Sequence, residues 1–431
     1  MVHFRDADIS KKSVIKVARK SPDSFINAIG PLIVVAQCLG IMPVLGVLMR
    51  NRNAVKFKWI AFRTIYSVLV LSCGLVELCL FLYRMKILGV TLHGVEGITF
   101  YGITVMGQLC FFLLATRWPK FVRCWDKVES VFLTRPYRTR ERRLERSVRS
   151  LYLFWIILAF IEYNLAQCAA INGISRALEI CPSTKITALE IFYRSQRPHV
   201  FMWIKYRRWM IPFLLLINMS LTFCWTYLDL FIMVTGISMA YRFKQISDRI
   251  HRMKGMTIPD SFWIEIRSHY LMMNELVLYV DKRLSMLILL SCASNLYFIC
   301  LQLYNSFKSF HNDLLSAFYF WFSLLFIMSR AICALLCAAS IHDSTKTPLK
   351  TIRNVSTKHW STELSRFAYS ITKDTIALTG RRFFYLTKSL VLAMAGTVVT
   401  YELVVMDQVD EKVEATNNNN STHPCNWTIH N

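Results

Sequence analysis

Polar and aromatic side chains recur inside long apolar stretches of this chain. Glu77 and Tyr101 lie in the first two stretches, and Asn164 and Gln167 lie three residues apart in the third. Polar residues inside apolar spans usually face a cavity or another helix, because burial in hydrocarbon is costly. Carboxylates and amides can match the donor and acceptor hydroxyls of a sugar, whose C–H faces can lie on Trp or Tyr rings. These residue types therefore predict a site for a polyhydroxylated ligand.

The predicted site draws side chains from each of the first six apolar stretches, in the halves that are assigned to the outer side below. Its members are Glu77, Tyr101, Glu162, Asn164, Gln167, Asn218, Trp225, Asn295, Tyr297, Gln302, Tyr319 and Trp321. Hydrogen bonding between helices is the competing explanation for any one of them. For Asp229, one helical turn beyond Trp225, a buried structural carboxylate with a paired neighbour is favoured.

No catalytic constellation accompanies these residues. The sequence has no G-x-S-x-G, H-E-x-x-H or P-loop motif, and its 10 His are isolated. The 13 Cys include no C-x-x-C pair, which argues against a zinc site. We expect no enzymatic activity, no metal ligands and no cofactor.

Composition indicates that the polar residues sit in membrane spans. Of the 431 residues, 54% are hydrophobic and 18% are charged, and the mean hydropathy is +0.37. This composition argues against disorder. It also argues against a nucleic-acid partner, although the net charge is +24. We predict an all-α polytopic protein of the lipid bilayer with Lys and Arg concentrated in its cytoplasmic loops.

Seven segments have the ~20 apolar residues that a helix needs to cross a bilayer. They are 59–83, 97–115, 151–170, 210–235, 284–303, 314–340 and 386–406. An eighth apolar stretch, 29–49, is interrupted by Pro31, Gly40, Pro43 and Gly46, which predicts a re-entrant or interfacial element. Before the last span, an apolar stripe from Leu364 to Leu378 predicts a helix that Gly380 ends.

Loop charge predicts the orientation. Segments 1–28, 117–149 and 236–283 hold six, eleven and eight Lys or Arg, so they should be cytoplasmic. This places the N-terminus inside and the C-terminus outside. Sequons at Asn420 and Asn426 agree, because glycosylation marks the outer side. The segment 173–208 disagrees with this orientation, because the segment would be outside yet holds seven basic residues.

The last span differs from the others in its small and hydroxyl side chains. Copies meeting on an axis would form a narrow pore, with a ring of carboxylates that favours cations. The predicted pore residues are Thr400, Leu403, Val404, Asp407 and Gln408. An ordinary packed helix is the alternative.

Four stretches together give the chain a family resemblance. They are 222–233 (TFCWTYLDLFIM), 263–270 (WIEIRSHY), 295–303 (NLYFICLQL) and 395–403 (AGTVVTYEL). With them the chain resembles, over about residues 29–406, the sugar-receptor subfamily of the insect gustatory receptors. The signature of that family usually closes with Gln-Phe, where this chain has Asp407 and Gln408.

The resemblance implies a tetrameric ligand-gated cation channel with seven transmembrane helices, in the plasma membrane of gustatory sensory neurons. It implies a six-helix ligand-binding bundle at 59–340, a cytoplasmic anchor helix at 341–380 and a pore-lining helix at 381–406. A cytoplasmic N-terminus (1–28), the re-entrant segment (29–49) and an extracellular tail (407–431) complete the expected organisation. The predicted function is a sugar-gated non-selective cation channel, assembled as a homotetramer or as a heterotetramer with related receptors. A G-protein-coupled-type chemoreceptor and a sugar transporter are the alternatives.

Overall fold

The computed structural model describes residues 23–49, 54–89, 92–137, 143–180, 187–253, 256, 258–308, 314–355 and 360–401. These residues are nearly all helical, with isolated β-bridges only between Leu45 and Lys56 and between Thr379 and Tyr385. The elements are α2 (Phe25–Cys38), α3 (Phe62–Leu88), α4 (Leu92–Phe132), α5 (Arg143–Ile180), α6 (Ala188–Gln196), α7 (Pro198–Phe201), η2 (Arg208–Met210), α8 (Ile211–Arg252), α9 (Asp260–Lys308), α10 (Leu314–Ile352) and α11 (Thr362–Lys373). A final helix spans Lys388–Tyr401.

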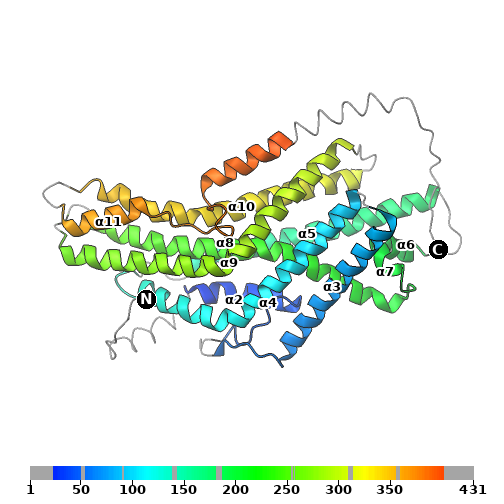
Figure 1. Cartoon of the computed structure of the whole chain (residues 1–431), viewed down its shortest axis with the longest axis horizontal. Coiled ribbons are helices and arrows are strands. Elements are labelled where there is room, and N and C mark those ends of the chain that lie inside the picture. Colours follow the sequence, from blue (N-terminus) through cyan, green and yellow to red (C-terminus); the bar gives the residue numbers. More distant parts are fainter. Residues whose placement is uncertain are drawn as a thin grey trace.

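Six of these helices, namely α3, α4, α5, α8, α9 and α10, are long and apolar enough to cross a membrane. They coincide with the first six predicted spans. The seventh prediction is tested only in part, because the described portion of its helix, Lys388–Tyr401, is shorter than a span and the remaining residues lie outside the described ranges. Figure 1 shows the long helices packed lengthwise, with α6 and α7 at one end of the bundle and α11 at the other.

Helix α8 is the central element of the bundle. It contacts α4, α5, α9 and α10, and most of its second half is buried. Its closest neighbour is α10, because a Cβ added to Gly236 would lie 2.5 Å from the carbonyl oxygen of Cys337. Glycine is therefore required for the two backbones to approach this closely. The core around them contains large buried aromatic residues, such as Trp118, Trp125 and Trp263.

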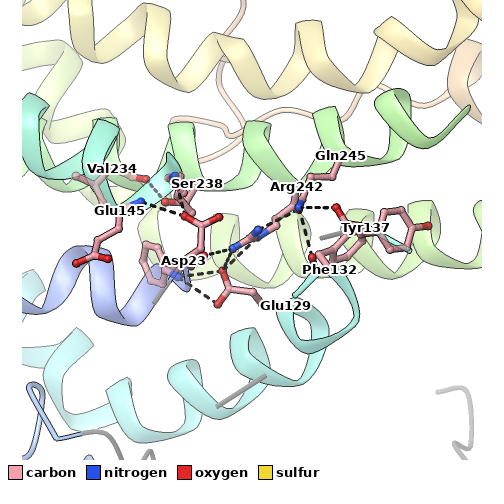
Figure 2. Close-up of polar contacts among 11 residues, drawn as sticks. Asp23, Glu129, Phe132, Tyr137, Glu145, Val234, Ser238, Arg242 and Gln245 are labelled. Carbon is pink, nitrogen blue, oxygen red and sulfur yellow. Dashed lines mark hydrogen bonds and ion pairs between the residues drawn. The ribbon is translucent and has the colours of Figure 1, made fainter. Parts of the chain in front are cut away.

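The apolar stretch at 29–49 contributes a short helix to this core. Helix α2 is continuous through Pro31, and most of its apolar side chains are almost fully buried, with α5 and α8 as neighbouring helices. Figure 2 shows the polar contacts that hold its start. Glu129 accepts a hydrogen bond from the Phe25 backbone N–H (3.0 Å), and Arg242 donates to both Glu129 (2.8 Å) and the Asp23 carbonyl (2.6 Å).

Helix α11 ends earlier than its apolar stripe suggests. The expected helix ended at Gly380, whereas α11 stops at Lys373, and residues 341–352 continue α10 instead of starting a new helix. The end has a physical cause: Lys346 donates from Nζ to the carbonyl oxygens of Ile371 and Asp374, which caps the last turn. The chain then makes a tight turn before the final helix.

Candidate functional site

A cavity of about 690 Å³ opens at the end of the bundle that holds α6 and α7. Its volume lies within the range of ~300–1,000 Å³ that is usual for small-molecule sites. The wall is formed by the end of α3, the start of α4, α6, α7 and the start of α8, with single residues of α5 and α9. Three predicted ligand residues, Tyr101, Gln167 and Asn218, line it.

A buried ion cluster forms one side of this cavity. Glu77 accepts a hydrogen bond from Arg197 Nη1, and its second oxygen lies 2.8 Å from His199 Nε2. All three side chains are nearly fully buried. Because an isolated buried charge is very costly, the carboxylate and the guanidinium compensate each other here. The cluster ties α7 to α3 at the rim of the cavity.

The cluster also leaves polar atoms without partners. Arg197 Nη2 and His199 Nδ1 are buried and make no hydrogen bond within the described part of the protein. Both residues line the cavity, and the rings of Phe81 and Tyr101 lie 5.1 and 5.4 Å from the His199 ring. The wall of the cavity therefore contains two buried polar atoms without hydrogen bonds, beside aromatic rings.

Other polar side chains complete the lining. Asn218 donates to the Tyr163 hydroxyl (3.2 Å) and Gln167 lies on the neighbouring α5. Burial raises the pKa of Tyr193, another lining residue on α6, so its phenol stays neutral and can donate or accept.

A second polar cluster lies between α8, α9 and α10 and collects two more of the predicted residues. Asp229 is fully buried and paired with Arg330 (Nε to Oδ2, 2.9 Å), and Asn295 donates to the same carboxylate (3.1 Å). The Arg330 guanidinium lies over the Trp225 ring, 4.7 Å from its centroid. Trp225 and Asn295 thus surround an ion pair, which agrees with the structural role favoured for Asp229.

A third group connects α5, α9 and α10. Ser323 donates to Glu162 (2.9 Å) and accepts from Gln302 Nε2 (3.1 Å). Tyr319 lies one helical turn before Ser323 on α10. The predicted residues Glu162, Gln302 and Tyr319 therefore form one group, but none of them lines the described cavity.

The remaining predicted ligand residues do not line the cavity. Asn164 is exposed and donates to the Phe160 carbonyl of its own helix (2.7 Å), although Gln167 faces the cavity from the next turn. Trp321 is 58% exposed. Tyr297 is half-buried, and its ring lies 5.1 Å from that of Phe298, which does line the cavity.

Of the predicted pore residues, only Thr400 is described. It is exposed and donates to the Gly396 carbonyl within its helix (2.9 Å). Leu403, Val404, Asp407 and Gln408, like the predicted glycosylation sites Asn420 and Asn426, lie outside the described residues.

Sequence reasoning missed Arg197, His199 and Arg330. A signal for Arg330 was available, because it is the charged residue within the apolar stretch 314–340. Arg197 and His199 lie in the basic segment 173–208, which conflicted with the charge rule. Their partner Glu77 is more than 100 residues away along the chain, so no local pattern joins them.

Comparison with known proteins agrees with this architecture. The chain resembles solved structures of the insect olfactory receptor OR5 from Machilis hrabei, with a TM-score of 0.57 and 14% identity over 92% of this chain and 98% of that chain. For the same receptor in complex with eugenol, the TM-score is 0.55 and the identity 16%. These identities are low, so they establish the shared fold alone.

Sequence relatives are more informative. The pattern of the trehalose receptor family matches residues 8–418. Drosophila melanogaster gustatory receptor for sugar taste 64a is 36% identical over 391 residues, which are 90% of this chain and 85% of that protein. Gustatory receptor 5a for trehalose, from the same organism, is 31% identical over 93% of this chain and 90% of its own length. The chain therefore belongs to the trehalose receptor family, within the sugar subfamily of the insect gustatory receptors, and is a multi-pass membrane receptor, not an enzyme.

Proposed function

We propose that this protein is a sugar-gated non-selective cation channel in the plasma membrane of gustatory sensory neurons. The observation that carries the proposal is the 690 Å³ cavity with its unsatisfied Arg197 and His199 atoms beside aromatic rings. Homology supports a sugar as the ligand, since the relatives are named for sugar taste and trehalose.

In this proposal the α6–α7 end is extracellular and the α11 end is cytoplasmic. The six-helix bundle at 59–340 binds the sugar, residues 341–380 contribute to a cytoplasmic anchor, and the helix that begins at Lys388 lines a pore between four copies. Sugar binds preferentially to a state with a contracted cavity, and this difference in affinity shifts the population towards the open pore. Glu77, Tyr101, Gln167 and Asn218 are the predicted ligand residues that the cavity and its ion cluster support best.

The cavity assignment can be tested with a matched pair on one helix. Gln167 lines the cavity and Asn164 does not, although both are amides of α5. Removing one neutral hydrogen bond costs ~0.5–1.5 kcal/mol, so Gln167→Ala should raise the half-activating sugar concentration roughly 2- to 10-fold. Asn164→Ala should leave it unchanged. Whole-cell currents against mono- and disaccharides give both values, and equal effects of the two variants would contradict the assignment.

The same recordings test the channel itself. Sugar-evoked cation current from cells that express the chain supports a channel, whereas sugar uptake without current would indicate a transporter. An epitope after Asn431 that stains on intact cells supports the proposed orientation. Absence of staining would favour the G-protein-coupled-type arrangement.

A further inference from the structure

An exposed segment of aromatic and basic residues joins α7 to α8. We call residues 202–209 the aromatic–basic segment. Trp203 is 59% exposed and Trp209 is 73% exposed. Lys205, Arg207 and Arg208 are exposed as well. The segment has the sequence MWIKYRRW, which contains no acidic residue.

The segment is continuous with the exposed apolar flank of α3. The Trp203 ring lies 5.3 Å from the Tyr83 ring near the end of that helix. Beside Tyr83, Leu82 and Ile87 are 45% and 54% exposed. In a membrane protein such a flank faces the lipid chains, so Trp203 lies where the flank of a span ends.

This placement matches the chemistry of the bilayer surface. Tryptophan is enriched where lipid chains meet headgroups, because its ring is apolar and its N–H is polar. Arginine binds phosphate with two parallel hydrogen bonds, and lysine binds it as a point charge. The absence of acidic residues disfavours a symmetric contact with a second copy, since Lys205, Arg207 and Arg208 would face their own like charges.

We propose that the aromatic–basic segment anchors the receptor to phospholipid headgroups in the leaflet at the α6–α7 end. Trp203 and Trp209 lie at the level of the headgroup–chain boundary, and Lys205, Arg207 and Arg208 bind lipid phosphate. This function also accounts for basic residues that conflict with the loop-charge rule: they serve at the outer surface as lipid ligands. The contact with a membrane surface does not depend on the proposed function; only the assignment of that surface to the outer leaflet rests on it.

The anchor is close to the sugar cavity along the chain. Arg197 and His199 line the cavity, and the short α7 (Pro198–Phe201) leads directly from them to Trp203. Lipid contact would therefore fix one wall of the cavity relative to the membrane surface.

Phosphate binding can be tested on the purified full-length receptor in detergent micelles by adding phosphatidylglycerol and following the thermal midpoint. The lipid should raise the midpoint of the wild type. A basic residue near an anionic surface contributes about a fivefold change in affinity, so K205Q/R207Q/R208Q should need a much higher lipid fraction for half of this shift. The control K350Q/R353Q/K373Q removes three exposed charges at the α11 end and should behave like the wild type.

Two further probes identify the source of the phosphate. Diacylglycerol with the same chains, which lacks phosphate, and inorganic phosphate should each fail to reproduce the difference between wild type and K205Q/R207Q/R208Q. Equal half-shift concentrations for that variant and the wild type would overturn the proposal. A difference reproduced by inorganic phosphate alone would also overturn it, because the site would then bind the free anion.

Tryptophan depth provides an independent measurement. The part of the wild-type fluorescence that is absent from W203F/W209F comes from Trp203 and Trp209. In nanodiscs, lipids brominated near the glycerol should quench this part, and aqueous iodide should not. Quenching by iodide alone would place both rings in water and overturn the anchor. Neither measurement uses sugar or current, so its failure would leave the proposed function standing.

Discussion

Glu77 shows how a single carboxylate organises one side of the candidate cavity. It is buried between Arg197, which lies between α6 and α7, and His199 of α7. The carboxylate has only two oxygens, and both are used by these partners. Arg197 Nη2 and His199 Nδ1 are the atoms that Glu77 does not engage; both are buried and make no hydrogen bond within the described residues.

At this scale the first prediction concerns the loss of the Glu77 charge. Glu77→Gln leaves Arg197 buried without a counter-charge, which should destabilise the receptor by about 3–5 kcal/mol. The control is Glu190→Gln, which breaks a partly exposed pair with Arg194 in the same region and should cost ~1 kcal/mol or less. Thermal midpoints of the purified receptors would measure both effects. Similar midpoints for the two variants would show that the Glu77 cluster is not the structural link described here.

Residue by residue, the sequence predicted the cavity only in part. Tyr101, Gln167 and Asn218 line it and Glu77 supports it, because polar groups in apolar spans must face something polar. The same rule could not separate a cavity from an ion pair, so it also selected Trp225 and Asn295, which surround Asp229 and Arg330. Contacts between residues distant in sequence decide which alternative applies.

At the scale of elements, hydropathy predicted seven spans because a bilayer requires long apolar helices, and six of them coincide with described helices that are long and apolar enough to cross. It could not predict the turn that follows α11. Arg381 and Arg382 adopt positive φ angles of 53° and 65°, and a Cβ on Gly380 would lie 2.3 Å from the Phe384 ring. Long side chains rarely adopt this conformation, so no propensity indicates it. The turn depends on tertiary contacts instead.

Asp281 supplies the main such contact. Its Oδ1 accepts from the Thr379 N–H (2.6 Å) and its Oδ2 from the Thr379 hydroxyl (2.8 Å), which links α9 to the turn before the final helix. If that helix lines the pore, this link transmits motion of the bundle to it. In the proposed channel, we therefore assign this link to gating and not to sugar recognition.

The second prediction follows for Asp281→Asn. Hydrogen bonds to a charged group contribute ~1.5–3 kcal/mol, so the substitution should change the gating equilibrium about 10- to 100-fold. We expect a lower current at saturating sugar with unchanged sugar binding. The control, Asp343→Asn, removes a half-exposed ion pair between α10 and Lys388, which lies at the start of the final helix. This control should have little effect. Unchanged maximal current in Asp281→Asn would exclude the proposed link.

At the scale of the whole molecule, the final helix is covered little by its own chain, since none of its described residues, 388–401, is buried. It packs on the core through Leu390, Val391, Met394 and Val398. Its other face carries Leu392, which is 76% exposed, and Val399, which is 56% exposed. Other copies of the chain would cover this face in the proposed tetramer, whereas lipid covers the outward flanks of the remaining helices.

The third prediction compares two leucines of similar exposure in the single chain. Leu392 lies on the final helix, and Leu325, which is 65% exposed, lies on α10. Leu392→Trp adds bulk where four copies are proposed to meet, and overpacking a close interface costs ~1–3 kcal/mol per copy. It should therefore reduce the tetramer fraction in mass photometry of the purified receptor and abolish sugar-evoked current. Leu325→Trp should be tolerated, because lipid chains can adjust to the larger side chain. If both variants remain tetrameric and conduct equally, the final helix does not form the shared axis, and the pore must be sought between other helices.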